Sequence, residues 1–219
     1  MIPLSDSAPS HRFPLVTYTL IVVNVVVFVE ELLSLDVEGF ILHYGLVPGA
    51  VSFLEPGSLF PFVTSMFLHA GLVHLVSNLW FLRIFGDSVE AALGWVKFLG
   101  FYLISGVIAN FTQYVFTPSS TIPMVGASGA VAGVLGAYLV FYPRHRIRTL
   151  IPVWGFWDVV ELPASVMLLY WFLIQLLSGV ATLGVAMATG GIAFFAHVGG
   201  FLFGYLASSS LRGKFLVSV

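Results

Sequence analysis

The amino-acid sequence predicts an all-α polytopic membrane protein, built as a bundle of six transmembrane helices. Three observations lead to this prediction: the low charge of the chain, the length of its apolar segments and the placement of its basic residues. Hydrophobic residues make up 59% of the 219 residues, and Asp, Glu, Lys and Arg together make up only 8%. Soluble domains contain about 25% charged residues, so this composition excludes an ordinary soluble domain.

Apolar segments of about 20 residues recur along the chain, and a helix of that length crosses a hydrocarbon core of ~30 Å. We therefore predict a single membrane domain over residues 1–219. Its six expected spans cover residues 14–33, 66–86, 95–116, 125–142, 162–178 and 190–209. We expect the first span to be retained, because its apolar run ends in Val29-Glu30-Glu31 and no small-residue cleavage site follows.

The connections between the spans differ in charge. Segment 34–65 contains acidic residues but neither Lys nor Arg, whereas segment 143–161 contains three arginines. With six spans, every basic residue falls on one side of the membrane: Arg12, Arg83, Lys97, Arg144, Arg146, Arg148, Arg212 and Lys214. The positive-inside rule then places both termini in the cytoplasm. We expect a multi-pass protein of a bacterial or archaeal plasma membrane.

Net charge and cysteine content narrow the classes of function. The formal net charge of -2 gives no reason to expect a nucleic-acid partner. The chain has no cysteine, which excludes disulfides and thiolate metal sites. We predict neither a metal nor a cofactor.

Four polar residues fall in the outer halves of the second, fourth and sixth spans: His74, Asn78, Ser128 and His197. Polar side chains at membrane depth are costly and face a protein interior or a water-filled cavity. At ~1.5 Å per helical residue, these four share a layer roughly 5–15 Å below the outer surface. Asn78 follows His74 by four residues, so both lie on one helical face.

Other polar residues of the spans are weaker candidates. His69 is five residues from His74, so we expect it to point elsewhere. Asn24, Asn110 and Gln175 are also polar residues within predicted spans, with no role assigned.

Ser128 is surrounded by small residues, because residues 126–130 read Gly-Ala-Ser-Gly-Ala. Gly126 and Gly129 let a substrate backbone approach the hydroxyl. Gly129 and Gly133 in the fourth span, and Gly200 and Gly204 in the sixth, are pairs four residues apart, a spacing typical of close helix packing. Taken alone, the small residues around Ser128 and each glycine pair are more typical of helix packing than of catalysis. Together they predict that the two spans approach until His197 meets Ser128.

These residues resemble the motifs of the rhomboid family of intramembrane serine proteases. The second span contains His74-x-x-x-Asn78, the fourth contains the serine motif at residues 126–130, and residues 196–200 of the sixth read Ala-His-Val-Gly-Gly. The resemblance runs over essentially the whole chain. It implies a six-transmembrane-helix rhomboid-like bundle and a Ser–His dyad without an acidic third member.

The chemistry of these side chains agrees with the resemblance. A serine becomes a nucleophile when a neutral imidazole takes its proton, so Ser128 is the expected nucleophile and His197 its base. His74, Asn78 and the Ser128 amide would stabilise the oxyanion. The implied partners are the lipid bilayer and single-span or other transmembrane proteins as substrates. By resemblance, the fifth span, including Trp171 and Phe172, is a candidate gate through which they enter.

Two alternatives stay open at this point. A catalytically inactive rhomboid-like protein would bind membrane helices without cutting them, although such a protein is expected to lose the serine or the histidine. A small transporter would line a solute path with its buried polar groups. Transport favours polar groups through the full depth of the membrane, whereas these four lie in the outer half.

Overall fold

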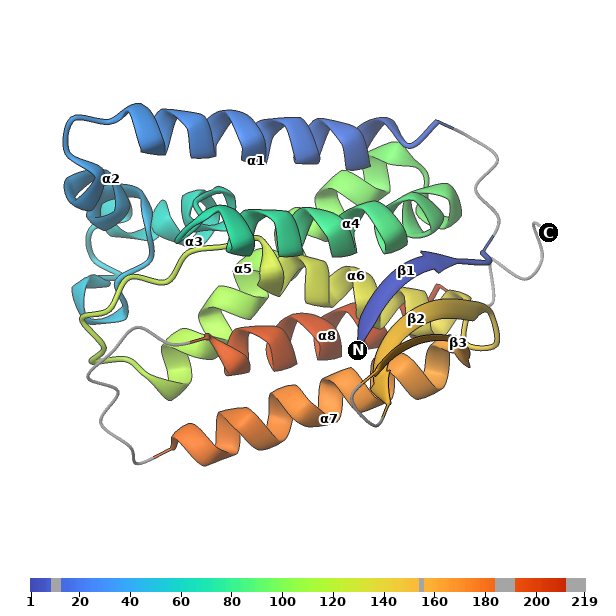
Figure 1. The fold of residues 1–219 in the computed structure, drawn as a ribbon. Coiled ribbons are helices and arrows are strands. Elements are labelled where there is room, and N and C mark those ends of the chain that lie inside the picture. Colours follow the sequence, from blue (N-terminus) through green and yellow to red (C-terminus); the bar gives the residue numbers. More distant parts are fainter. Residues whose placement is uncertain (9–12, 154–155, 184–191, 212–219) are drawn as a thin grey trace.

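The computed structural model describes residues 1–8, 13–153, 156–183 and 192–211. Six helices make up its bundle: α1 (Leu15–Leu33), α4 (Leu72–Leu93), α5 (Trp95–Phe116), α6 (Ser128–Phe141), α7 (Ala164–Thr182) and α8 (Phe194–Ser209). Helices α4, α6 and α8 run in one direction, and α1, α5 and α7 run in the other (Figure 1). The first residues of α4, α6 and α8 therefore gather at one end of the bundle.

Three of these helices, α1, α5 and α7, are long and apolar enough to cross a membrane. Helix α4 and the bent segment Pro56–Phe67 before it form a fourth candidate span. Helices α6 and α8 are apolar but shorter, with 14 and 16 residues. At ~1.5 Å per residue they fall short of a ~30 Å core. By length the described residues thus support three or four spans, and the six-span count stays a prediction.

The second predicted span, 66–86, differs from helix α4, which begins at Leu72 and ends at Leu93. Residues 65–67 form a 3-10 turn, and the chain is then non-helical up to Gly71, whose φ of 151° favours glycine. His69 therefore lies outside the helix. The other predicted spans differ from α1, α5, α6, α7 and α8 by at most four residues at either end. Residues 190 and 191 of the last predicted span lie outside the described residues.

The core of the bundle lies around α6. Every residue of α6 from Gly129 to Phe141 is buried, and Figure 1 shows this helix between α4, α5 and α8. The largest fully buried side chains nearby are aromatic, among them Phe85, Tyr102 and Tyr138. Helix α7 is peripheral in comparison, with only Ala164, Met167, Leu168 and Gly179 buried. Helix α6 thus positions its first residue, Ser128, rigidly within the protein.

One feature contradicts the all-α prediction: the chain also forms a three-stranded antiparallel sheet. Its strands are β1 (Ile2–Asp6), β2 (Arg146–Val153) and β3 (Phe156–Pro163), in the order β1-β2-β3. In β2, Ile147 and Thr149 are buried while Arg146 and Arg148 are exposed. That alternation is typical of a strand with one buried face. The sequence indicates only a connection at 143–161, because the pairing of β2 with β1 joins segments far apart in the chain.

The opposite end of the bundle carries segment 34–65, which packs against the chain before α6. It forms α2 (Val37–Tyr44), α3 (Pro61–Thr64) and three 3-10 turns: Pro48–Ala50, Pro56–Leu59 and Ser65–Phe67. Leu46 is fully buried and exchanges backbone hydrogen bonds of 3.0 and 2.8 Å with Met124. The Gly49 N–H donates to the carbonyl of Ser120 over 2.8 Å. Segment 34–65 is therefore anchored close to Ser128.

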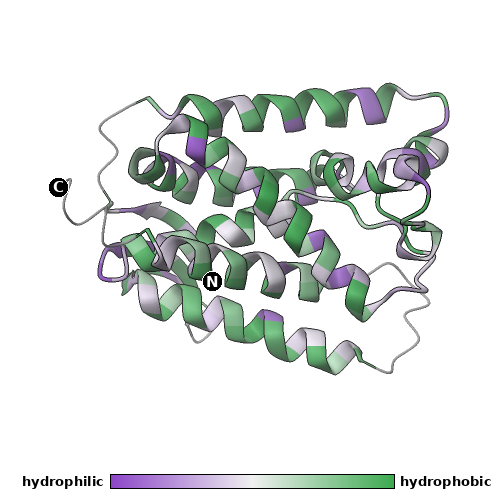
Figure 2. Ribbon diagram, turned by 180° about the vertical axis from the view of Figure 1, so that it is seen from behind, coloured by the Kyte–Doolittle hydropathy of each residue, from purple (hydrophilic) through white to green (hydrophobic). Residues whose placement is uncertain are grey.

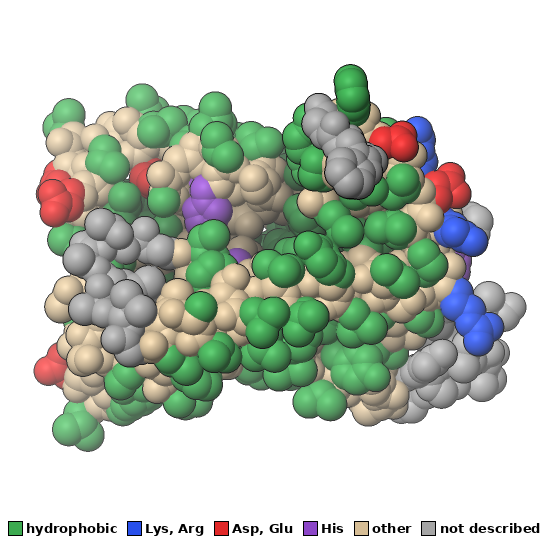
Figure 3. Space-filling view, turned by 60° about the horizontal axis from the view of Figure 1, so that its bottom comes forward, with side chains coloured by type: hydrophobic (Ala, Val, Ile, Leu, Met, Phe, Trp, Pro, Cys, Tyr) green, Lys and Arg blue, Asp and Glu red, His purple; other side chains and the backbone are tan. Residues whose placement is uncertain are grey.

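The outer surface of the bundle is largely apolar. The helices are mostly hydrophobic in Figure 2, and hydrophobic side chains cover the middle of the face in Figure 3. In Figure 3 the Lys and Arg side chains lie at one end, the end at which Figure 1 draws the sheet. Arg12, Arg212 and Lys214, used above to orient the chain, lie outside the described residues. A surface of this kind is suited to lipid rather than to water.

Candidate active site

Ser128 is the first residue of α6, and the turn before it brings it close to α4. Gly126 has a φ of 123°, a conformation that favours glycine, and its N–H donates to the Ser65 carbonyl over 2.9 Å. A Cβ at Gly126 would lie 2.8 Å from Nε2 of His74. Any other residue at this position would therefore push His74 away. Backbone N–H groups at a helix start have no partner within the helix, which makes them candidate donors to a ligand.

His197 lies in the first turn of α8 and is 9% exposed. Its Nε2 is 2.8 Å from Oγ of Ser128, a hydrogen-bond distance. The start of α8 is held by α5, because Oε1 of Gln113 accepts a 3.2 Å hydrogen bond from the Ala196 N–H. This arrangement allows a proton to pass between the hydroxyl and the imidazole.

The other nitrogen of the imidazole contacts α7. Nδ1 of His197 lies 2.7 Å from Oε1 of Gln175. The indole of Trp171, four residues earlier on α7, lies against the same imidazole, with 5.8 Å between ring centroids and a 33° angle between planes. The sequence had singled out Gln175 only as a polar residue in a span. An amide in an otherwise apolar stretch was the available signal, but nothing in it pointed to His197.

His74 and Asn78, in the first two turns of α4, lie beside Gly126. Nδ2 of Asn78 lies 3.4 Å from the position of a Cβ built on Gly126. Nε2 of His74 approaches the same Cβ position. Asn78 is 6% exposed, and its Nδ2 is buried without a hydrogen-bond partner. Two side chains with N–H groups thus converge on the backbone two residues before Ser128.

His69 packs behind His74, which corrects the expectation that it points elsewhere. Its ring lies 5.2 Å from the His74 ring, edge to face, and both ring nitrogens are buried without a hydrogen-bond partner. The backbone N–H of His69 donates a hydrogen bond to the carboxylate of buried Glu31 over 3.1 Å. The expectation failed because it assumed that the helix extended to residue 69.

Asn110 of α5 links two parts of the site. Its Nδ2 donates hydrogen bonds of 2.9 Å to the Phe62 carbonyl and to Oγ of Ser65. The carbonyl of Ser65 in turn accepts the hydrogen bond from Gly126. Through Ser65, Asn110 therefore fixes the position of Gly126, in the turn that precedes Ser128.

The four glycines of α6 and α8 lie where the two helices touch. A Cβ added to Gly200 would overlap the carbonyl oxygen of Gly129, and a Cβ on Gly204 would overlap that of Gly133. Gly129 and Gly133 also face Ala109 and Ser105 of α5. These contacts between backbones bring the first turns of α6 and α8 together, and with them Ser128 and His197.

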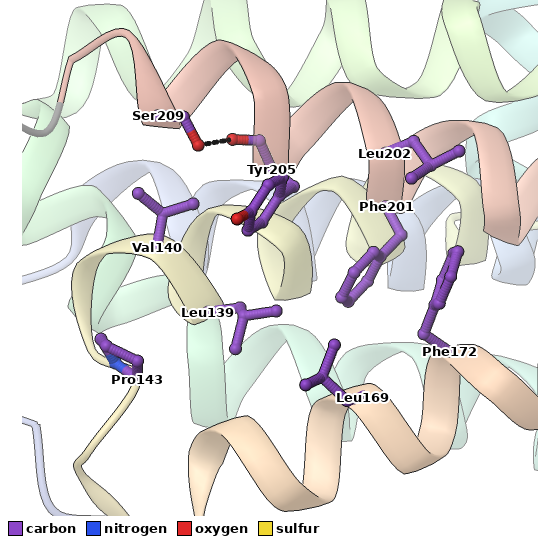
Figure 4. Close-up of a pocket in the computed structure, with 9 residues that line it drawn as sticks. All are labelled: Leu139, Val140, Pro143, Leu169, Phe172, Phe201, Leu202, Tyr205 and Ser209. Carbon is purple, nitrogen blue, oxygen red and sulfur yellow. Dashed lines mark hydrogen bonds between the residues drawn. The ribbon is translucent and has the colours of Figure 1, made fainter.

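Figure 4 shows a pocket that is separate from this site. It has a volume of about 370 Å³ and is lined by Leu139, Val140, Pro143, Leu169, Phe172, Phe201, Leu202, Tyr205 and Ser209. Leu139 and Val140 are near the end of α6, whereas Ser128 begins it. Among the described residues there is also no group of three or more His, Asp or Glu side chains that could hold a metal ion.

The apolar helices and surface define the class of this chain, an integral membrane protein. A family model described as the rhomboid domain matches residues 56–214, most of the sequence, and the chain belongs to the rhomboid family.

Relatives include presenilin-associated rhomboid-like protein A, mitochondrial, of Danio rerio, 35% identical over 66% of this chain. The rhomboid protease GluP of Bacillus subtilis is 29% identical over 73% of the chain, and the putative rhomboid protease YdcA of the same organism is 36% identical over 48%. The matched regions cover 35%, 27% and 53% of these three relatives. Because the first relatives are named mitochondrial, the comparison does not support the expected bacterial or archaeal plasma membrane.

Proposed function

We propose that this protein is an intramembrane serine endopeptidase that hydrolyses peptide bonds in or near transmembrane segments of other membrane proteins. The observation that supports this most strongly is the 2.8 Å contact between Oγ of Ser128 and Nε2 of His197. A serine paired with a buried imidazole is the arrangement that nucleophilic peptide hydrolysis requires. Membership of a family with relatives named as proteases supports the same conclusion.

In the proposed reaction, Oγ of Ser128 attacks the carbonyl carbon of the scissile bond while Nε2 of His197 takes the hydroxyl proton. The tetrahedral intermediate then collapses, the C–N bond breaks, and His197 gives its proton to the departing amine. An acyl group remains on Ser128. Water, deprotonated by the same imidazole, attacks this ester. The ester C–O bond then breaks, His197 gives its proton back to Oγ of Ser128, and the second product leaves.

Asn78 and His74 are the proposed donors to the oxyanion, together with the Ser128 N–H. The free Nδ2 of Asn78 supports this role, because a buried donor without a partner is costly and suits a charge that forms only during reaction. Removing one donor of this kind typically slows a reaction by ~10²–10³-fold.

The same proposal includes the membrane arrangement. All six helices would cross the bilayer, including α6, which is short and surrounded by other helices, and α8, which is short but partly exposed, and both termini would be cytoplasmic. Ser128 and His197 would then lie towards the outer side, where α4, α6 and α8 begin. Single-span proteins, or other transmembrane proteins, are the proposed substrates. Each carbonyl of a membrane helix is hydrogen-bonded along the backbone, so a substrate must unwind locally before Ser128 reaches it.

Cleavage of a single-span reporter by purified protein in proteoliposomes tests the chemistry. Wild type should cut the reporter and react with a fluorophosphonate probe at Ser128, and Ser128→Ala should do neither. Turnover by a verified Ser128→Ala preparation would overturn the proposal. A folded wild type that neither cuts nor reacts would favour the inactive helix-binding alternative.

Cysteine accessibility tests the arrangement in the membrane, since the natural chain has no cysteine to interfere. Single cysteines at Pro56 and Ser119 should react with an impermeant reagent added to the outer side, and a cysteine at His145 should not. The reverse pattern would overturn the proposed orientation.

A further inference from the structure

The imidazole of His197 makes two hydrogen bonds within the described part of the chain, one at each nitrogen. Nε2 contacts Ser128 over 2.8 Å, and Nδ1 contacts Oε1 of Gln175 over 2.7 Å. We propose that Gln175 is a positioning residue that selects the reactive tautomer and orientation of His197. This inference rests on the proposed protease function and adds to it a third group, where the sequence suggested a dyad.

The role follows from the chemistry of a neutral imidazole, which carries a proton on one nitrogen and a lone pair on the other. An amide oxygen facing Nδ1 can only accept, so it requires the proton to be on Nδ1. The lone pair is then on Nε2, facing the hydroxyl of Ser128. An amide NH₂ facing Nδ1 would have the opposite effect, placing the proton on Nε2 and leaving no acceptor for the serine proton.

An amide suits this position because it adds no charge to an apolar bundle. In soluble serine proteases a buried carboxylate accepts a hydrogen bond from the Nδ1–H of the histidine and stays ionised. An unpaired carboxylate in a membrane is expensive, whereas a neutral glutamine is much less so. Once Nε2 takes the serine proton, the Nδ1–H bond to Gln175 becomes charge-assisted and therefore stronger. Gln175 would thus stabilise the imidazolium when it forms.

Trp171 supports the same orientation from the same helix face. Trp171 and Gln175 are four residues apart on α7, so their side chains point in the same direction. The indole lies against the imidazole plane, which restricts rotation of the ring, while Gln175 fixes which nitrogen faces Ser128. Any displacement of α7 away from α8 would therefore remove both restraints on the base.

Substitutions at Gln175 in the full chain test this role. In Gln175→Leu, which keeps the bulk and removes the acceptor, kcat for the reporter should fall about 10–10²-fold, with KM changed less than about twofold. Gln175→Glu restores an acceptor and should recover most of the rate. Its carboxylate also stabilises the imidazolium, so the acid limb of the kcat profile should move to higher pH. Ser178→Ala, which removes another polar group of α7, should match wild type.

A second measurement reads the imidazole directly and does not depend on turnover. Nitrogen-15 NMR of the detergent-solubilised protein, assigned with His197→Ala, should show the proton of neutral His197 on Nδ1 in wild type. In Gln175→Leu this preference should weaken, while the melting temperature stays close to that of wild type.

Two results would overturn the role of Gln175. The first is an unchanged kcat and tautomer in Gln175→Leu. The second is an equal loss in the Leu and Glu variants with an unshifted pH profile, which would indicate packing alone. If wild type cuts no reporter, the proposed function fails, and the NMR comparison still decides whether Gln175 selects the tautomer.

Discussion

Helix α8 contacts α6 and α7 in two different ways. Against α6 its backbone touches backbone, because Gly200 and Gly204 leave no room for a Cβ beside Gly129 and Gly133. Against α7 the contact is made by side chains. Phe172 stacks on Phe201 with 4.7 Å between ring centroids, and Gln175 reaches His197 over 2.7 Å.

The two contacts have different tolerances. Close-packed backbones cannot absorb an added methyl group without moving a helix, so the distance between Ser128 and His197 depends strictly on glycine. Side chains at a peripheral helix have rotamer freedom and can adjust. We infer that α6 and α8 set the distance between nucleophile and base, whereas α7 sets the orientation of the base.

The largest effect is expected where both contacts converge, at the Ser128–His197 pair. Ser128→Ala or His197→Ala should reduce reporter cleavage to the detection limit, a loss of ~10⁴-fold or more. The double variant should be no worse than either single variant, because the residues act as a unit. Circular dichroism should show an unchanged helical signal. Additive losses would argue that the two side chains work separately.

The next largest effect is expected at the glycine contact between α6 and α8. Gly200→Leu should separate the two helices, lowering stability by about 1–3 kcal/mol or more and cutting both cleavage and fluorophosphonate labelling. Gly100→Leu on α5 is a matched control, since nothing lies within 4 Å of a Cβ at that position. Thermal unfolding in detergent checks both. Equal tolerance at Gly200 and Gly100 would disprove the close contact.

Intermediate effects are expected at His74 and Asn78, which touch neither interface of α8. Each alanine variant should lower kcat by ~10²–10³-fold and retain some activity, because the remaining donors still bind the oxyanion. Fluorophosphonate labelling of Ser128 should fall in parallel. A variant with full kcat would remove that residue from the oxyanion site.

The smallest effect is expected at the aromatic contact between α7 and α8. Phe172→Ala removes the stacking on Phe201 and should lower stability by about 1 kcal/mol. Labelling of Ser128 should stay within about twofold of wild type, because α6 and α8 still set the distance to His197. A loss of labelling as large as that of Gly200→Leu would show that α7, too, determines this distance.

Several parts of the fold could be predicted from sequence, and others could not. The span predicted at 95–116 coincides with helix α5, because a long apolar segment bounded by Gly94 and Thr117 leaves little choice for a helix. The start of α4 was missed, because the turn at 65–67 and the non-helical chain up to Gly71 are as apolar as the helix. The sheet was missed, because β1 pairs with a strand far along the chain. No local pattern in either segment predicts that the two pair.

By itself, the sequence determined the class of protein and predicted which residues share one depth in the membrane. Apolar length, charge placement and the spacing of Ser128, His197, His74 and Asn78 are properties of composition and helical period, so they can be read before folding. Only the tertiary structure decided which atoms face one another. Gln175 and His197 lie 22 residues apart on separate helices, and their contact depends on how α7 is rotated and placed against α8. Packing sets that rotation, and no local pattern in either helix encodes it.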